Sequence, residues 1–240
     1  MSEHFFGAGV SASSYIHEWT SLQRGNPLPE PNQSASPWCS SLFEAKAKIA
    51  LPAAYPTHLN YQQLINQRQS LREYADRPVN VADLATFLEH ASRPFNPATK
   101  PLSLLAPLML KSDDLALGGY VYNPAAHQLA VLRTADPLET LQRYCFQREF
   151  LQAPLIVLVL TSLPSAINQA GDRGYRQALL DAGAHLQRLY VAAQRVGMVG
   201  CATGSVIQGQ LARWLGFDDY QTQVLIGFAA GYPHKEQTHD

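Results

Sequence analysis

The most regular alternation of apolar and polar positions lies in the second half of the chain, between residues 171 and 204. Apolar or small residues recur there every three or four positions, which is the spacing of a helix with one buried face. The apolar side carries Leu179, Ala182, Gly183, Leu186, Leu189, Tyr190, Ala193, Val196 and Gly197, and the polar side carries Gln177, Asp181, His185, Arg188 and Arg195. Because small residues allow another helix to approach closely, we expect one long helix in the core or at a subunit interface.

Other stretches predict shorter elements around this helix. Asn80, with Asp83 three residues later, is a helix cap followed by apolar positions at helical spacing. Continuous apolar runs of strand length predict strands covered on both faces. The expected helices span residues 11–24, 59–67, 81–92, 137–147 and 208–215, and the expected strands span 120–122, 128–133, 155–160 and 223–230.

The order of these elements indicates the fold class. Helices and strands are interleaved, and a hairpin joins residues 120–122 to 128–133, so we predict an α+β fold with a mostly antiparallel sheet flanked by helices. Four prolines predict a loop at residues 93–107. Prolines are also frequent before residue 56, where we expect an extended N-terminal arm and linker, residues 1–56, packed on a main domain of residues 57–240.

Composition narrows the classes of function. The chain has 240 residues, a formal net charge of -1 and a pI near 6.7, so it offers no basic patch for nucleic acid or an anionic membrane. It has no apolar run of about 18 residues and no basic-then-apolar start, which predicts a cytoplasmic protein. A metabolite or a protein is the expected partner.

Cysteines and histidines give no metal motif. Cys39, Cys145 and Cys201 are widely spaced and odd in number, which is typical of reduced thiols rather than of a zinc site. The eight histidines show no paired spacing, so no metal is expected. Cys201 has no identifiable histidine and asparagine partners for nucleophilic catalysis. His185 falls on the polar side of the long helix, where a surface histidine is more common than a catalytic one.

One polar segment of the first half carries candidate chemistry. Arg68, Ser70 and Arg72 place two guanidinium groups and a hydroxyl within five residues, directly after a predicted helix. Guanidinium groups bind phosphate through paired donors, so this triplet is a candidate site for a phosphomonoester. A solvated polar helix end would have the same sequence, and both interpretations stay open on these residues alone.

Several segments together resemble one enzyme family. Residues 68–74 with the Pro-Val pair at 78–79 resemble the RRSxRxF…PV opening of the nitroreductase superfamily. Residues 15–20, the hairpin at 119–129, residues 171–183 and the ending 227–233 resemble its SagB-type branch. Enzymes of that branch are flavin-dependent dehydrogenases that oxidise azolines to thiazoles and oxazoles in modified peptides. The resemblance covers nearly the whole chain.

The resemblance implies a homodimeric FMN enzyme with the cofactor in the subunit interface. The residues that would bind FMN are Arg68, Gln69, Ser70, Arg72, Ser103, Ala202, Thr203 and Gly204. The first four form the phosphate motif, Ser103 falls in a stretch that matches the flavin loop, and the last three would approach the isoalloxazine with their backbone. The hydride chemistry would be the cofactor's, and the substrate would be peptide-derived or carrier-bound.

Two departures from the family pattern bear on activity. The branch has a catalytic Lys-Tyr pair where this chain has Gln169 and Ala170, and neither residue can take a proton. Loss of a general base typically lowers a rate by about 10²–10⁴; Asp172 or Tyr175 could act as a substitute. The family's PSGGALYP loop matches Pro101–Leu108, where leucines replace two glycines that allow a close approach to the ring.

The sequence leaves three functions open. The first is an FMN-dependent oxidoreductase of the azoline-dehydrogenase type. The second is a non-catalytic relative that serves as a partner or scaffold, for example in a heterodimer with an active dehydrogenase, because the departures fall at the flavin loop and the base. The third is an NAD(P)H-dependent flavin nitro- or quinone reductase, which needs no proton from its substrate.

Overall fold

One antiparallel sheet forms the centre of the protein. The computed structural model describes residues 13, 16, 17, 20, 21, 38–44, 46–57, 60–93 and 102–234. Within them seven strands lie in the order β1-β4-β3-β2-β5-β7-β6, and every neighbouring pair is antiparallel. The strands are β1 (Lys48–Ala50), β2 (Ser103–Met109), β3 (Gly118–Asn123), β4 (Gln128–Arg133), β5 (Leu155–Thr161), β6 (Val199–Thr203) and β7 (Gln223–Gly231).

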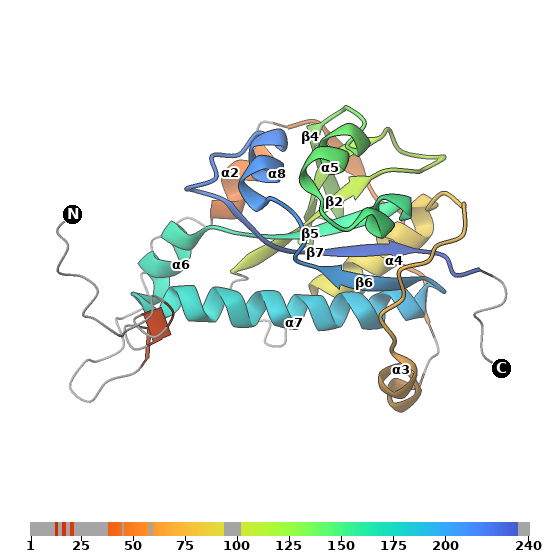
Figure 1. Cartoon of the computed structure of the whole chain (residues 1–240), viewed down its shortest axis with the longest axis horizontal. Helices are drawn as coiled ribbons and strands as arrows, with labels where there is room; N and C mark the ends of the chain where they lie inside the picture. The colour runs from red at the N-terminus through yellow and green to blue at the C-terminus, as the bar shows by residue number, and fades with distance from the viewer. Residues whose placement is uncertain are drawn as a thin grey trace.

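Helices cover both faces of this sheet, which confirms the predicted α+β fold. They are α2 (Trp38–Glu44), α3 (Tyr61–Gln67), α4 (Val81–Ser92), α5 (Leu138–Tyr144), α6 (Leu163–Ala170), α7 (Arg173–Arg195), α8 (Gln208–Trp214) and the 3₁₀ helix η1 (Arg148–Gln152). In Figure 1 the long α7 runs along the lower side of the sheet, whereas α5 and α8 lie above it. None of the helices in the described part of the chain is long and apolar enough to cross a membrane.

Strand β5 explains how one sheet supports two core layers. All seven of its residues are buried. Successive side chains point to opposite faces: the odd-numbered residues of 155–159 pack in the layer shared with α4 and α7, and the even-numbered residues of 156–160 in the layer shared with α5, η1 and α8. A strand covered on both faces is apolar throughout, as residues 155–160 are, and this is why the sequence predicts it correctly.

The stretch expected to be a loop contains a central strand, so that prediction is wrong. Ser103–Met109 form β2, which pairs with β5 over its full length and is buried throughout. Pro107 is tolerated because β3 pairs only with the last two residues of β2, so the proline lies outside that ladder. Leu104 and Leu105 are core residues of this strand. Residues 103–108 of the stretch matched to the glycine-rich flavin loop therefore lie in a buried strand.

Helix α7 buries much of the side that the pattern predicts, including Ala182, Leu189, Tyr190 and Ala193, but it differs from the prediction at other positions. Ala178 and Ala182 are buried, and His185 is only 4% exposed, whereas Leu179 and Leu180 are 44% and 68% exposed. Small residues such as Ala178 and Ala182 are thus buried on the same helix as Leu189 and Tyr190, while two of its leucines face outward. The prediction that His185 lies on the polar, solvent-facing side is wrong.

Other boundaries differ in smaller ways. Helix α4 has the predicted bounds, and its Asn80 cap accepts the Asp83 N–H. Helix α5 ends at Tyr144 instead of residue 147. Strands β1 and β6 and helices α2 and α6 were not predicted; α2 interrupts the stretch expected to be extended. Most of the helix expected at residues 11–24 lies outside the described residues, and the domain boundary near residue 56 stays a prediction.

A hydrogen-bond cluster at Asp83 ties three parts of the chain together. The carboxylate accepts hydrogen bonds from Tyr55 (2.7 Å), from the Asn80 amide (2.7 Å) and from Tyr232 at the end of β7. Burial, and then the bond to Asp83, raises the pKa of Tyr55 to about 12, and the same causes raise the pKa of Tyr232. The cluster thus fixes the segment before residue 56 and the C-terminal strand to the start of α4.

Candidate functional site

The predicted phosphate segment runs along an edge of the sheet. Strand β6 is the last strand in the sheet order, so within the part of the chain that the structure describes one side of it has no neighbouring strand. The N–H of Leu71 donates to the carbonyl of Gly200 in β6 at 3.1 Å. This contact places residues 68–72, far away in sequence, beside the strand that carries Ala202.

Arg68 and Ser70 form a polar pair on this segment. The Arg68 Nη1 donates to the Ser70 Oγ at 3.3 Å, and the Arg68 guanidinium lies 5.1 Å from the centroid of the Tyr190 ring. Ser70 is exposed and Arg68 is partly exposed. A fixed guanidinium next to a hydroxyl on an accessible surface is an arrangement that suits a phosphate.

Tyr190 of α7 joins this pair to β6. Its hydroxyl lies 2.9 Å from the Ser70 Oγ and accepts the N–H of Ala202 at 2.9 Å. The ring packs edge-on against Phe228, with centroids 4.8 Å apart. Sequence reasoning placed Tyr190 only among the apolar positions of the long helix, because no local pattern reveals that Ser70, 120 residues away, meets its hydroxyl.

Arg72 is more heavily engaged than Arg68. It forms an ion pair with Glu149 at 3.5 Å, and its guanidinium lies 5.7 Å from the Phe150 ring centroid. A hydrogen bond with the Cys201 side chain is the main cause that raises the pKa of Arg72. The side chain is half exposed, so the Glu149 carboxylate would compete in water with a phosphate for this cation.

The other end of β6 offers an open surface at one glycine. A Cβ added to Gly204 would meet nothing within 4 Å, and Gly204 is exposed. Thr203 is buried, and its hydroxyl lies 2.7 Å from the Ser205 Oγ and accepts the Ser205 N–H at 3.2 Å. A flat ligand could therefore approach Gly204, while the N–H groups of Ala202 and Ser205 are already engaged inside the chain.

Ser103 lies in a different group. It belongs to β2, which is separated from β6 by β5 and β7, a distance of about 14 Å at the usual strand spacing. Its hydroxyl donates to Asp181 of α7 at 2.5 Å and lies 3.4 Å from His185 Nδ1. Burial lowers the pKa of His185 to about 4, against the opposing effect of the Asp181 carboxylate. Ser103 therefore takes part in a buried polar cluster of its own.

The candidate acids and bases lie at the far end of α7. Tyr175 is 15 residues from Tyr190 on the same helix, which corresponds to about 22 Å. Asp172 is exposed just before that helix. The Gln169 amide donates to the Ser165 hydroxyl at 3.3 Å within α6. Within one subunit, none of these residues reaches the group around Ser70.

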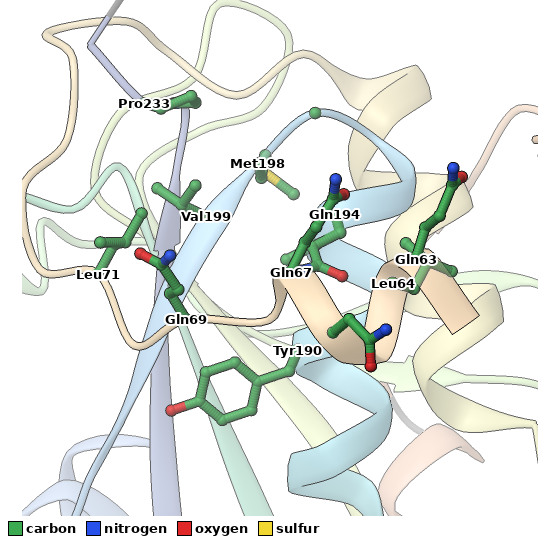
Figure 2. A pocket seen from close by; sticks show the side chains of 14 residues that line it. Gln63, Leu64, Gln67, Gln69, Leu71, Tyr190, Gln194, Met198, Val199 and Pro233 are labelled. Carbon is green, nitrogen blue, oxygen red and sulfur yellow. The ribbon is translucent and has the colours of Figure 1, made fainter. Parts of the chain in front are cut away.

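A pocket of about 430 Å³ adjoins the phosphate segment. Its walls come from α3, from residues 69–71, from the C-terminal part of α7 and from the start of β6. Figure 2 shows Gln63 and Gln67 on the α3 side, with Met198 and Val199 opposite them. Gln69 lines this pocket together with Tyr190, whose hydroxyl contacts Ser70. Among the described residues, no cluster of His, Cys, Asp and Glu could hold a metal.

Comparison with known families identifies the fold family. The family model for nitroreductases, described as the nitroreductase family, matches residues 65–232. The chain belongs to the nitroreductase family. The matched region begins within α3 and ends at Tyr232, which hydrogen-bonds Asp83. It therefore contains both the phosphate segment and the whole of α7.

Solved nitroreductase structures share this fold. A protein of Anabaena variabilis named as a nitroreductase is 22% identical with a TM-score of 0.77; the match covers 92% of this chain and 47% of that one, so this chain spans about half of its length. A chain of the E. coli microcin synthetase McbBCD complex, solved with truncated pro-MccB17 bound, is 16% identical with a TM-score of 0.60 over 84% of each chain. A Desulfovibrio desulfuricans protein named as a nitroreductase and solved with FMN is 19% identical, with a TM-score of 0.53, over 77% of this chain and 92% of that one.

The residues of this chain fit FMN at two points. Arg68 and Ser70 provide a cation and a hydroxyl for a phosphate, and the surface at Gly204 has no side chain that would obstruct a ring. The likeness to these solved structures shows the fold, and the assignment to the SagB-type branch goes beyond it.

Proposed function

We propose that this nitroreductase is an FMN-dependent oxidoreductase in which Arg68 and Ser70 hold the FMN phosphate and the Gly204 end of β6 faces the ring. The observation that carries the proposal is the contact of Leu71 with Gly200, which brings the Arg68–Ser70 pair to the edge strand. Arg72 would add a second positive charge, shared with Glu149. The known binding of FMN by a protein of the same fold supports the choice of cofactor.

When bound, FMN would supply hydride transfer, and the residues of this chain would bind and orient it. Arg68 would neutralise the phosphate and Ser70 would donate to it. Gln169 and Ala170 offer no group that exchanges a proton, so a reaction that removes a proton from the substrate would need a base from elsewhere.

We infer further that the substrate class is that of the azoline dehydrogenases, peptide-derived or carrier-bound rings. The motifs of the SagB-type branch support this choice, and so does the shared fold with a chain of the E. coli microcin synthetase complex. Oxidation of a synthetic thiazoline peptide, measured by mass spectrometry as the loss of two hydrogens, tests it. Reduction of a quinone by NADPH without thiazoline oxidation would favour the nitro- or quinone-reductase alternative.

A homodimer through α7 belongs to the proposal. Leu180 is 68% exposed and Leu179 44%, and a Cβ added to Gly183 would meet nothing within 4 Å, so this side of α7 has an apolar, low surface that no other part of the described residues covers. Light scattering on Leu180→Glu should show a monomer. Phe146→Glu, a change at an apolar side chain that is 74% exposed near the end of α5, is the control and should leave the dimer intact; the opposite pattern would exclude this interface.

The flavin itself is the first test. The purified chain is incubated with FMN, desalted, and its absorbance spectrum recorded; we expect bound flavin. Arg68→Gln should weaken FMN binding by about tenfold or more, as expected for the loss of a charged hydrogen bond. Arg143→Gln, which breaks a surface ion pair with Glu139 on α5, is the matched control. A wild-type chain that never retains flavin would favour the non-catalytic alternative, which the missing proton acceptor at 169–170 already motivates.

A further inference from the structure

A chain of hydrogen bonds runs from the edge strand to the phosphate segment. The N–H of Ala202 donates to the phenol oxygen of Tyr190 at 2.9 Å, and that oxygen lies 2.9 Å from the Ser70 Oγ. The Arg68 Nη1 donates to the same Ser70 oxygen at 3.3 Å. Three segments that are distant in sequence therefore meet at two hydroxyl groups.

The hydrogen bonds of this series all donate in one direction, from Ala202 through Tyr190 to Ser70. A backbone N–H can only donate, so the Tyr190 oxygen accepts from Ala202 and its own proton needs another acceptor. The acceptor within reach among the described residues is the Ser70 Oγ. If Ser70 donated instead, the phenol proton would lie without a partner on a side chain that is only 9% exposed, which is costly for a buried donor. Tyr190 is therefore the donor to Ser70.

This direction decides what Ser70 can offer a ligand. Its oxygen accepts from Tyr190 and from Arg68, which occupies both of its lone pairs. Only its proton remains, on a residue that is exposed. We infer that Tyr190 is a positioning residue that fixes Ser70 as a hydrogen-bond donor, so that this site selects a ligand with an anionic phosphate. The inference rests on the proposed FMN site and deepens it.

A second consequence concerns Ala202. The resemblance assigns its backbone to the isoalloxazine, but its N–H is engaged with Tyr190 at 2.9 Å. Ala202 thus acts on the phosphate end, through Tyr190 and Ser70, and the ring receives its contact from the open surface at Gly204. Chains of hydroxyl groups strengthen one another, so each donor in the series makes the next a better donor.

The test compares FMN with riboflavin, which lacks the phosphate. Dissociation constants for both are measured by flavin fluorescence on the wild type, Tyr190→Phe, Ser70→Ala and Tyr74→Phe. Tyr74 is the matched control because it is a buried tyrosine of the same segment whose hydroxyl donates to the carbonyls of Leu71 and Ala229, at 3.2 and 3.4 Å, and has no bond to Ser70. We expect Tyr190→Phe to weaken FMN about three- to tenfold, the effect of one net hydrogen bond, with riboflavin unchanged.

The outcomes separate the inference from the proposal on which it rests. A wild type that binds FMN no better than riboflavin overturns the phosphate site and the inference together. Tight FMN binding with equal FMN-to-riboflavin selectivity in Tyr190→Phe and the wild type overturns the role of Tyr190 alone. If Tyr190→Phe does not fold, Ser70→Ala decides: unchanged selectivity overturns the inference. In the double variant, Tyr190→Phe should add nothing to Ser70→Ala, because Tyr190 acts through Ser70.

Discussion

The buried histidine of α7 gives the most quantitative prediction. His185 is 4% exposed, and burial lowers its pKa to about 4 from an ordinary value of 6.5. Two charged side chains of the same helix also act on this pKa: Asp181 raises it and Arg188 lowers it. The hydroxyl of Ser103 reaches His185 from β2. Since the folded protein resists protonating His185 and the unfolded chain does not, stability should be full above about pH 6.5 and should fall as the pH drops toward 4.

The size of the effect follows from the two pKa values. At about pH 5 an unfolded histidine is almost fully protonated, whereas a histidine with a pKa of about 4 carries about a tenth of a proton. Integrated from about pH 7.5 to about pH 5, this difference lowers the free energy of unfolding by roughly 2 kcal/mol. That is a large share of the total stability of an ordinary domain.

Urea unfolding of the wild type and of His185→Gln at several pH values in this range measures the effect. The acids and histidines that do not interact with His185 contribute equally to both proteins, so they cancel in the difference between the two curves. We expect the difference to change by roughly 2 kcal/mol, with the glutamine variant the less sensitive to acid. Parallel curves would show that His185 is not held neutral in the folded protein, and the reasoning from burial would fail.

Four further variants test other contacts. Gly200→Ala should lower the free energy of unfolding by about 1–3 kcal/mol, because its Cβ would lie 2.5 Å from the Ala229 carbonyl; an equally stable variant would contradict the β6 packing. Gly204→Ala should leave urea unfolding unchanged and weaken FMN binding. Asp83→Asn should cost about 2 kcal/mol in the same assay, because an amide cannot accept from all three donors. Arg176→Gln, which removes hydrogen bonds to His17, Thr20 and Ser21, should speed proteolysis before residue 38 without changing the unfolding midpoint.

The local sequence pattern is sufficient to predict those elements whose residues are buried uniformly or at a strict period. Residues 155–160 are apolar throughout and become β5, and the Asn80 cap marks the start of α4 to the residue. The pattern fails at β2, where the density of prolines indicates a loop. Pro107 is accommodated only because β3 ends its pairing beside it, and that is a property of the neighbouring strand, not of the segment itself.

The polar part of the site is less predictable for a physical reason. Periodicity tells which residues of α7 share a side, but it does not tell what they meet. Ser103 and Asp181 are 78 residues apart, and Ser70 and Tyr190 are 120 apart, so neither hydrogen bond leaves a local signal. The motif around Arg68 predicts the phosphate segment, but nothing in it predicts the tyrosine that orients Ser70.

Helix α7 makes both of these hydrogen bonds between residues that are distant in sequence. Asp181 holds the start of β2, and Tyr190, nine residues later, holds the phosphate segment and β6. Both contacts are therefore made by one 23-residue helix that packs along the sheet. A helix that the sequence marks only as amphipathic is thus the element that contacts both polar groups.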